Sequence, residues 1–497
     1  MAVSETASHQ RPATRDPRPA ARDRRALAAL AALVALGALI RFWRIGHQSY
    51  WLDEAFTVDL VRQGFGGMLS AIPSTESTPP LYYALAWLWA KVFGAGEAGL
   101  RSFSAVLGVA TIPVVWLTAR ELFRERAALV AAALAAVNPY LVWYSQEARS
   151  YSLLAFLCAL SLLLFARALR EPRGRTFAAW AGVAVLAVFT HYFAVFLLVP
   201  EIGWLVYATR RRAALAAAGA LAAACGLLAP LALHQRGSGH TTFISQLGNR
   251  RIVDIPKKLV TGELGSPLPL LGPVAGLLVV AAIAYGVARS EPRWRRNQLV
   301  LLGLAAATLA IPLAIKLAGA DYLLARNVIA LYVPLILAAA GGLGLARAGR
   351  VGVLGAVALS AAALVVNVQV AYNSKLERDD WRGAARALGP PIQTRAVVVT
   401  SAPQAKPLQL YAGEMQVLPT WGATVGEVDV VGNARPPRFA EPPQPSGFRG
   451  VYRKITPSYE LIRYVSPRPV TVTPAELARS RLGTKPAAIL LQSPGRR

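Results

Sequence analysis

Several residue types and motifs that define large classes of protein are scarce in this chain of 497 residues. It contains two cysteines and five histidines, and no Cys/His spacing typical of a zinc site or Gly-rich loop typical of a nucleotide site occurs. Cys158 and Cys225 both lie inside apolar segments, where a packing role is the simpler interpretation. Nothing therefore favours a zinc-binding or nucleotide-binding protein, and the cysteines leave the redox compartment open.

Charge is also scarce, at 16% of residues, and acidic residues are the scarcer kind, with 26 Asp and Glu against 53 Lys and Arg. Apolar residues make up 55% of the chain and the mean hydropathy is +0.41. The excess of basic charge falls largely in short loops between apolar runs, which is how membrane proteins set their orientation. We therefore expect a polytopic α-helical protein of the inner (plasma) membrane that binds the lipid bilayer and no nucleic acid.

Apolar runs of bilayer-spanning length recur along most of the chain. We expect about eleven transmembrane helices, near residues 26–45, 102–119, 127–143, 151–166, 176–190, 194–209, 213–233, 266–288, 298–318, 328–346 and 351–371. Basic clusters fall in alternate loops, near residues 1–25, 120–126, 167–175, 210–212, 289–296 and 347–350. The positive-inside bias places these loops and the N-terminus in the cytoplasm, and the C-terminus outside.

One aromatic segment, residues 79–93, decides this orientation. It is apolar but short for a span, and counting it as one would place the basic loops outside. We interpret it as an interfacial helix lying along the membrane. The first outer loop, residues 47–101, then holds two interfacial helices, the other being near residues 53–70, where apolar positions have helical spacing.

The composition divides the chain into three parts. Residues 1–25 are predicted to be a disordered basic cytoplasmic tail, residues 26–372 the transmembrane domain, and residues 373–497 a small extracytoplasmic α/β domain. Within the last part we expect a helix at 380–388, strands at 396–400 and 488–491, and a loose Pro-rich stretch at 435–447. From its position alone, this domain is expected to shape the acceptor entrance.

An acidic pair, Asp53 and Glu54, lies a few residues beyond the end of the first span, among Trp43, Tyr50 and Trp51. Such aromatic side chains favour the headgroup level of a bilayer. Carboxylates near lipid are costly to hold, which makes the pair a candidate functional site. The alternative is a solvated pair that only starts a helix, where acids interact well with the helix dipole.

Further polar residues gather on the same face if the topology is correct. Each has a simpler explanation by itself, since an Arg can snorkel at a helix end and a His can be a satisfied interfacial residue. Their convergence suggests a site for an anionic lipid headgroup. The members are Arg101, Gln146, Glu147, Arg149, His191, Tyr192, Asp321, Tyr322, Arg326 and Asn327.

Four motifs then carry a resemblance. They are Trp51-Leu52-Asp53-Glu54, Thr78-Pro79-Pro80-Leu81-Tyr82-Tyr83, the run from Gly96 to Ala105, and the run from Tyr144 to Tyr151. In this order they resemble the family 39 glycosyltransferases of the GT-C class, over roughly residues 26–372. That group includes protein O-mannosyltransferases and lipid A aminoarabinose transferases. The resemblance implies a polyprenyl-phosphate sugar donor, used on the outer face of the membrane, and a catalytic carboxylate at Asp53.

The chemistry explains the residue types. A hydroxyl acceptor is a poor nucleophile, so a carboxylate that accepts its proton assists attack on the anomeric carbon. Cations that stabilise a leaving phosphate lower the barrier. We expect an inverting transfer, with mannose as the first candidate sugar and a protein, glycan or lipid acceptor. Asp53 is the expected base, with Glu54 orienting it or contacting the acceptor, and Arg101 is the leading candidate for phosphate binding.

The remaining expected substrate-binding residues are Glu147, Arg149, His191, Tyr192, Tyr322 and Arg326. No cofactor is expected with certainty; a carboxylate pair near a phosphate could hold a divalent cation, but no ligand set with metal-like spacing is visible and no metal residue is assigned. Thr78 stands where many relatives have His or Lys, Ala55-Phe56-Thr57 where aminoarabinose transferases have an Arg, and Arg326-Asn327 where many have Arg-Tyr. These differences count against an aminoarabinose role.

Two other classes of function stay open on the sequence. A secondary transporter or lipid flippase would bind near the bilayer midplane and show internal repeats, whereas this chain has few charges in mid-span and its polar set lies at one face. A non-catalytic scaffold for envelope assembly is the third alternative, and it predicts that Asp53→Asn is silent.

Overall fold

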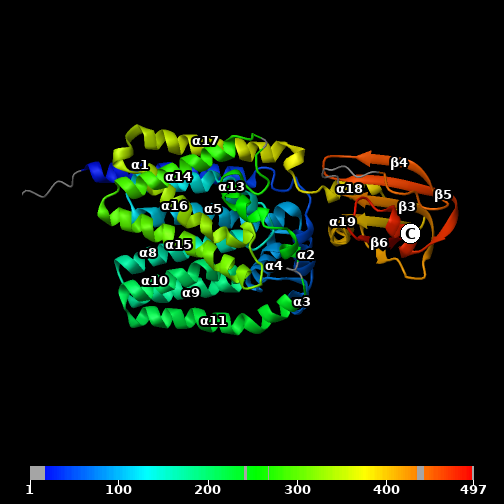
Figure 1. The fold of residues 1–497 in the computed structure, drawn as a ribbon, viewed down its shortest axis with the longest axis horizontal. Helices are drawn as coiled ribbons and strands as arrows, with labels where there is room; N and C mark the ends of the chain where they lie inside the picture. The colour runs from blue at the N-terminus through cyan, green and yellow to red at the C-terminus, as the bar shows by residue number, and fades with distance from the viewer. Residues whose placement is uncertain (1–16, 240–242, 267, 434–440, 495–497) are drawn as a thin grey trace, which may run out of the picture.

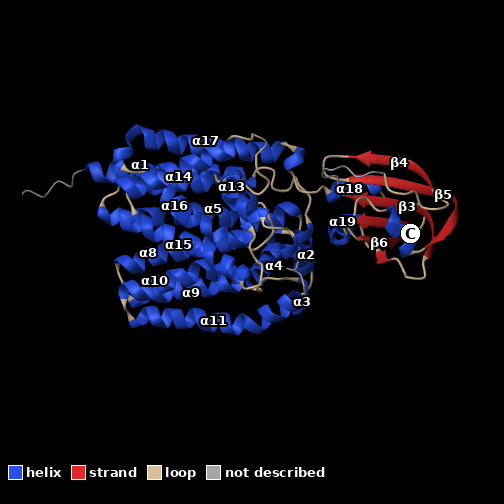
Figure 2. Cartoon of the chain, viewed as in Figure 1, coloured by secondary structure: helices blue, strands red, loops and turns tan. Residues whose placement is uncertain are grey.

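The computed structural model describes residues 17–239, 243–266, 268–433 and 441–494. A long helical bundle is followed by a separate C-terminal domain that lies at one end of it (Figure 1). Every strand in the described residues belongs to the C-terminal domain (Figure 2). The expected combination of a polytopic helical domain and a small α/β domain is confirmed.

The bundle consists of long apolar helices and several short ones near the end that faces the C-terminal domain (Figure 1). The α-helices are α1 (Pro17–Phe42), α2 (Leu52–Arg62), α3 (Phe65–Thr75), α4 (Leu81–Phe93), α5 (Glu97–Leu122), α6 (Glu125–Val137), α7 (Pro139–Ser145), α8 (Tyr151–Arg170), α9 (Gly174–Thr190), α10 (Val195–Thr209), α11 (Arg212–Gly237), α12 (Phe243–Gln246), α13 (Arg250–Thr261), α14 (Leu271–Arg289), α15 (Pro292–Leu317), α16 (Tyr332–Leu343) and α17 (Gly349–Tyr372). Short 3-10 helices are η1 (Tyr192–Ala194), η2 (Ala325–Leu331), η3 (Ala346–Ala348) and η4 (Ser374–Leu376).

Each expected span falls on a helix or on consecutive helices of this bundle, with residues 127–143 divided between α6 and α7 and residues 328–346 extending over η2 and α16. Within the described residues, nine helices are long and apolar enough to cross a membrane, or ten if α6 and α7, which are bent by 53° at Asn138, form one span. The apolar helix α9 has 17 residues and is too short to be counted among them. The bend is explained by Pro139, which cannot donate the hydrogen bond that would continue α6, while Asn138 caps the N–H groups of α7.

The N-terminal boundary differs from the expected one. Residues 1–16 lie outside the described part of the chain, so the predicted tail remains an expectation there. Helix α1 begins at Pro17 and already includes residues 17–25.

The first outer loop contains three helices, and the expectation of two was wrong. The predicted helix at 53–70 is divided into α2 and α3, because the backbone is extended at Gln63 and Gly64. The carbonyl of Gln63 is satisfied instead by the indole N–H of Trp87, at 2.9 Å. The second predicted helix matches α4, which ends at Gly94, where the backbone has a positive φ of 79° that favours glycine.

The basic loops gather at the end of the bundle opposite the C-terminal domain. Arg126 donates to the carbonyl of Gly349, and Arg124 lies 3.9 Å from Glu291, so three of these loops are in contact. Arg167 and Glu121 join two of them at 3.1 Å. Basic loops on one side of the bundle are expected if residues 79–93 form an interfacial helix and not a membrane span.

The C-terminal domain is a six-stranded sheet with helices on both faces. Its strands are β1 (Arg395–Thr400), β2 (Gln416–Val417), β3 (Ala423–Gly432), β4 (Arg449–Ile455), β5 (Glu460–Val472) and β6 (Ala487–Gln492), in the order β2-β6-β1-β3-β5-β4. Among the strands that the structure describes, β1 and β3 form the one parallel pair, with Arg395 opposite Glu427. The helices are α18 (Trp381–Leu388), α19 (Ala405–Ala412) and α20 (Pro474–Leu477), with short η5 (Ala402–Gln404) and η6 (Ala478–Ser480).

Alternating side chains of β1 divide the core of this domain in two. Val397 and Val399 pack with Trp381 of α18 and Leu408 of α19 on one face. Ala396 and Val398 pack with Leu477 of α20 on the other face. The predicted helix and both predicted strands are present, whereas β2 to β5 were not anticipated. The expected loose stretch at 435–447 falls partly on residues 434–440, which lie outside the described residues.

Candidate active site

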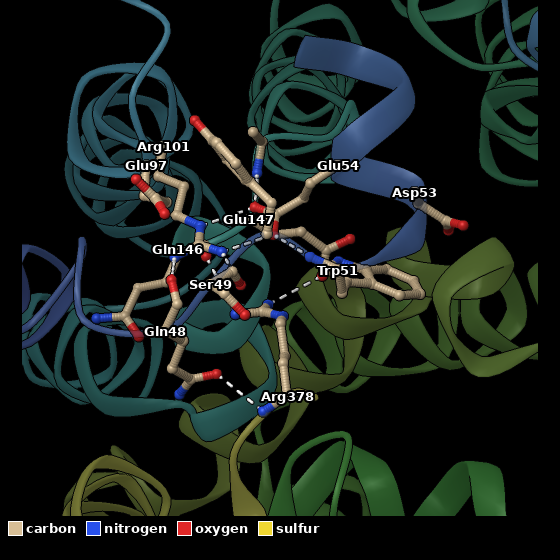
Figure 3. Close-up of polar contacts among 12 residues, drawn as sticks. Gln48, Ser49, Trp51, Asp53, Glu54, Glu97, Arg101, Gln146, Glu147 and Arg378 are labelled. Atoms are coloured by element: carbon tan, nitrogen blue, oxygen red, sulfur yellow. Dashed lines mark hydrogen bonds and ion pairs between the residues drawn. The ribbon is translucent and has the colours of Figure 1, made fainter. Parts of the chain in front are cut away.

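Helix α2 directs the acidic pair in two directions. Consecutive helical residues are separated by about 100° around the axis, so Asp53 and Glu54 cannot face the same neighbours. The helix begins after Trp51, whose backbone is extended and whose N–H donates to Glu54 Oε2 at 3.4 Å. Asp53 points away from the polar cluster around Glu54 (Figure 3). The two carboxylates therefore have different environments.

Glu54 is fully buried and is held by Arg101 of α5. The guanidinium donates from Nε to Glu54 Oε1 at 2.7 Å and from Nη2 to Oε2 at 2.6 Å. The N–H of Ala148 adds a bond of 2.8 Å to Oε1. Burial alone would raise the pKa of Glu54, but the charge and hydrogen bonds of Arg101 lower it below its usual value. Glu54 is therefore a charged structural group that joins α2, α5 and the loop after α7.

This arrangement corrects two expectations. The remaining donors of Arg101 bind the carbonyls of Ile45, Gln48 and Ser49, at 3.1, 2.7 and 3.0 Å, so all five guanidinium N–H groups are engaged. Arg101 is 1% exposed and has no donor to offer a phosphate. Both oxygens of Glu54 are likewise occupied, so Glu54 cannot contact an acceptor. The two residues stabilise the loop that precedes Asp53.

A second buried pair joins Arg149 to Glu76. Arg149 Nη1 and Nη2 each lie 2.9 Å from one oxygen of Glu76. The Nη1 atom also donates to the carbonyl of Asp53 at 3.1 Å and to Thr57 Oγ1 at 3.2 Å. Arg149 therefore fixes the first turn of α2 from the side on which Asp53 is located. Its carboxylate partner is Glu76 and not the nearby Glu147.

Glu147 is paired with a residue from the C-terminal segment. Arg378 Nη2 donates to Glu147 Oε2 at 3.1 Å, and the guanidinium lies 4.1 Å from the ring centroid of Trp143 (Figure 3). Burial raises the pKa of Glu147 to about 7, with Arg378 acting in the opposite direction. The other oxygen, Oε1, is buried without a protein partner. A buried carboxyl oxygen of this kind is available to a ligand that donates a hydrogen bond.

The segment around Arg378 also binds the loop that leads to Asp53. Ser49 donates to the carbonyl of Asp379 at 2.8 Å and accepts from the N–H of Trp381 at 3.0 Å. The Tyr411 hydroxyl accepts from the N–H of Tyr50 at 2.7 Å. The C-terminal domain is thus hydrogen-bonded to the backbone just before the acidic pair.

Asp53 has a different partner, Arg326 of η2. Asp53 Oδ2 lies 3.3 Å from Arg326 Nη1, and the two side chains are 23% and 22% exposed. The Arg326 guanidinium is 5.9 Å from the ring centroid of Trp51. Among the ion pairs of the site that the structure describes, this is the one in which both side chains are partly exposed. It can serve base and anion-binding chemistry.

His191 lies in a line of aromatic rings beside this pair. Its Nδ1 accepts from the N–H of Phe193 at 3.3 Å, which leaves the proton of the neutral ring on Nε2. Burial, with the nearby Arg149 and Arg326, lowers the pKa of His191 to about 3, so the imidazole is a neutral donor and not a base at neutral pH. The ring of Tyr151 is 5.7 Å away.

The recorded contacts of Tyr192 and Tyr322 are with residues other than Asp53 and Glu54. The hydroxyl of Tyr192 donates to Gln235 of α11 at 2.8 Å, so it supports the loop around residues 72–78 and not the ion pair. The ring of Tyr322 lies 5.5 Å from that of Phe193.

An apolar cavity of about 590 Å³ opens within the bundle. It is lined mainly by aliphatic side chains of α6, α13, α14, α15, α16 and α17. Tyr332 at its lining stacks on Tyr140 at 4.5 Å, and the rings of Tyr140, Tyr144 and Tyr151 follow at 4.8 Å intervals. This line of rings connects the cavity to His191 and the polar site.

The acidic pair does not fit a divalent cation. Glu54 has both oxygens committed to Arg101, Ala148 and Trp51, so only the carboxylate of Asp53 is left, facing a guanidinium. Within the described residues, no group of three or more His, Cys, Asp or Glu side chains is placed to hold a metal ion. The chemistry of the site is therefore derived from its side chains alone.

Sequence reasoning missed three residues of this site, namely Glu76, Arg378 and Gln235. Glu76 lies two residues before the Thr78-Pro79 motif, and an isolated acid beside an aromatic helix was an available signal. Arg378 stands in a charged run at a domain boundary, and nothing local indicates its pairing with Glu147.

Comparison with known proteins gives the fold and a partial family match. Residues 77–234 match the family described as dolichyl-phosphate-mannose-protein mannosyltransferase. ArnT from Cupriavidus metallidurans in the apo state has a TM-score of 0.58 at 12% identity, over 88% of this chain and 98% of that chain. Its complex with undecaprenyl phosphate gives a TM-score of 0.54 at 13% identity, over 87% and 97%. The expected GT-C fold is confirmed.

Two further matches are partial. The apo oligosaccharyltransferase of Archaeoglobus fulgidus has a TM-score of 0.51 at 15% identity, over 78% of this chain and 64% of that chain. An uncharacterized protein of Aquifex aeolicus (strain VF5) is 32% identical over 90 residues, which are 17% of this chain and 18% of that protein. The chain thus spans less than two thirds of either protein. The family match favours an enzyme over the transporter and scaffold alternatives.

Proposed function

We propose that this chain, a GT-C class glycosyltransferase of the protein mannosyltransferase and ArnT type, transfers a sugar from a polyprenyl-phosphate donor to an acceptor outside the cytoplasmic membrane. Mannose is the first candidate sugar, because the matching family is described by a mannosyl donor. The undecaprenyl phosphate bound to ArnT supports a lipid-linked donor. The acceptor is a protein, glycan or lipid that carries a free hydroxyl.

The partly exposed ion pair of Asp53 and Arg326 is the observation that carries this proposal. Asp53 accepts the proton of the acceptor hydroxyl as its oxygen attacks the anomeric carbon. The bond from that carbon to the phosphate oxygen breaks on the opposite face, which inverts the configuration. Arg326 compensates the charge that develops on the leaving phosphate. In this mechanism Arg101, Arg149 and Arg378 have a structural role and keep the residues around Asp53 in position.

The apolar cavity suits the lipid part of the donor. Its lining is aliphatic, and isoprene units gain free energy on leaving water for such a surface. The line of tyrosine rings from Tyr332 to Tyr151 leads from the cavity toward the ion pair. A polyprenyl chain in the cavity would place its phosphate near Arg326, with neutral His191 as a further hydrogen-bond donor.

The orientation of the chain follows from the same proposal. The basic loops at the opposite end of the bundle face the cytoplasm, and the site and C-terminal domain face outward. Because Arg378 of this outer segment pairs with buried Glu147, deletion of residues 373–497 should impair donor binding as well as acceptor use. This extends the expectation that the domain shapes the acceptor entrance to a role in donor binding.

The test is transfer by the purified full chain in lipid nanodiscs. The donor is radiolabelled polyprenyl-phosphate mannose, followed by a panel of other polyprenyl-phosphate sugars, and the acceptor is a crude envelope fraction. The matched pair of variants is Asp53→Asn and Asp59→Asn, since Asp59 lies on the same helix and pairs with Lys406 outside the site. We expect transfer by wild type and Asp59→Asn and none above background by Asp53→Asn. Equal transfer by both variants would refute Asp53 as the base.

A further inference from the structure

The arginines near α2 differ in how firmly they are held. Arg101 uses all five donors on buried protein acceptors, Arg149 is bidentate to buried Glu76, and Arg378 is buried against Glu147. Arg326 has a single ion-pair contact, at 3.3 Å to Asp53, and about a fifth of its side chain is exposed. Of these four cations in the described residues, Arg326 can change partner at the lowest cost.

The partner of Arg326 is the residue proposed to be the base. While Asp53 Oδ2 faces the guanidinium, that oxygen and Nη1 are engaged with each other, and the negative charge of Asp53 offsets the attraction of Arg326 for a phosphate. Asp53 therefore competes with a phosphate for Arg326 before substrate arrives. A phosphodiester presents two charged oxygens that match the fork of a guanidinium, as a carboxylate does.

The backbone of Asp53 is fixed independently of its side chain. Arg149 holds its carbonyl at 3.1 Å, and Glu54 is anchored to Arg101 and Ala148. The start of α2 therefore stays in place when the Asp53 carboxylate leaves Arg326. Only side-chain rotation is needed, and the carboxylate, already 23% exposed, can move toward open space.

We propose that the donor phosphate displaces Asp53 from Arg326, so that donor binding both seats the leaving group and frees the base. The inference rests on the proposed function and adds an order of events to it. The donor binds first, and the acceptor hydroxyl meets a competent carboxylate only afterwards. An acceptor that enters an empty site therefore finds the base already paired.

The test measures binding of polyprenyl phosphate, without a sugar, to the full chain in nanodiscs by isothermal calorimetry. Asp53→Asn removes the competitor for Arg326, so it should bind about two- to fivefold tighter than wild type, the range for a partly exposed ion pair. Arg326→Gln should bind at least roughly tenfold weaker, since a charged hydrogen-bonding partner is lost, and Arg326→Lys should recover part of that loss. Asp59→Asn should bind like wild type.

The double variant, Asp53→Asn with Arg326→Gln, separates displacement from simple repulsion. If Asp53 competes for Arg326, the gain from Asp53→Asn disappears in the Arg326→Gln background. If Asp53 merely repels the phosphate, the gain persists there, and the proposed exchange is overturned. Asp53→Asn binding no tighter than wild type would also overturn it. Failure of wild type to bind polyprenyl phosphate at all would overturn the proposed function itself, and the exchange with it.

Discussion

Asp53 and Glu54 are neighbours in the chain and differ in almost every physical respect. Glu54 is fully buried and each of its oxygens accepts strong hydrogen bonds, whereas Asp53 is 23% exposed and makes one ion-pair contact at 3.3 Å. A buried carboxylate whose two oxygens both accept hydrogen bonds is fixed in place and has no oxygen left for a substrate. A partly exposed carboxylate with one contact can exchange partners. The comparison separates a group that builds the site from a group that can act in it.

The same contrast applies to the arginines. Arg101, Arg149 and Arg378 each face a buried glutamate, and Arg326 faces the exposed aspartate. Removing one member of a buried pair leaves an uncompensated charge, which is far more destabilising than losing an exposed pair. The following variants are ordered by the size of the effect that this contrast predicts.

The largest effect on stability is expected from Arg101→Leu. It leaves Glu54 charged in the interior and the carbonyls of Ile45, Gln48 and Ser49 unsatisfied, at a cost of about 3–5 kcal/mol. The thermal denaturation midpoint of the purified protein should fall, and Glu54→Leu with Arg101→Leu should recover part of the loss. If Arg101→Leu were as stable as wild type but failed to bind the donor, Arg101 would have to be assigned to phosphate binding instead.

Glu147→Gln should change how stability depends on pH. Burial raises the folded-state pKa of Glu147 from 4.5 to about 7, so the folded protein binds a proton that the unfolded chain has released. Wild type therefore loses stability as pH rises from about 4.5 to 7, by at most roughly 3 kcal/mol. The denaturation midpoint of wild type should fall across this window, whereas that of Glu147→Gln, which lacks the titrating group, should stay nearly constant. Parallel curves would show that Glu147 does not titrate there.

Arg149→Lys should cause an intermediate effect. Lysine keeps the charge but cannot bind both oxygens of Glu76, the Asp53 carbonyl and Thr57 at once. We expect a stability loss of about 1–2 kcal/mol and roughly tenfold slower transfer, because α2 no longer positions Asp53 firmly. Arg167→Lys, in an exposed pair with Glu121, is the matched control and should leave both quantities unchanged.

The smallest effect is expected at the rim of the contact between the two domains. Arg382 lies 3.2 Å from Glu97, with side chains 28% and 17% exposed, so Arg382→Ala should cost less than about 1 kcal/mol. Arg378→Ala, a few residues earlier, removes the buried partner of Glu147 and should be clearly more destabilising. Equal midpoints for these two variants would mean that burial does not set the strength of the contact.

What the sequence predicted well depends on local signals. Long apolar runs placed the helices of the bundle, the aromatic run at 79–93 placed α4, and Asp380 before an amphipathic run placed α18. Strands β4 and β5 were missed because β4 is exposed along its whole length and β5 contains Pro467 and Pro469. Neither strand has the alternation by which a half-buried strand is recognised.

The roles within the site could not be read locally. The pairs Glu54–Arg101, Glu76–Arg149 and Glu147–Arg378 are separated by 47, 73 and 231 positions in the chain. Which arginine faces which acid is set by the packing of α2, α5 and the segment after α17. The sequence therefore identified Asp53, Arg149, Glu147 and Arg326 as a group but gave the phosphate role to Arg101, whose donors are all used within the protein.

The most direct test of the account measures transfer and thermal stability side by side for Asp53→Asn and Glu54→Gln. The account predicts that Asp53→Asn keeps the wild-type denaturation midpoint and loses transfer at saturating donor. Glu54→Gln should have a lower midpoint, because it weakens the bonds to Arg101, and the protein that remains folded should retain measurable transfer. The opposite pattern, a stable and inactive Glu54→Gln beside an active Asp53→Asn, would contradict the division of roles between the two carboxylates.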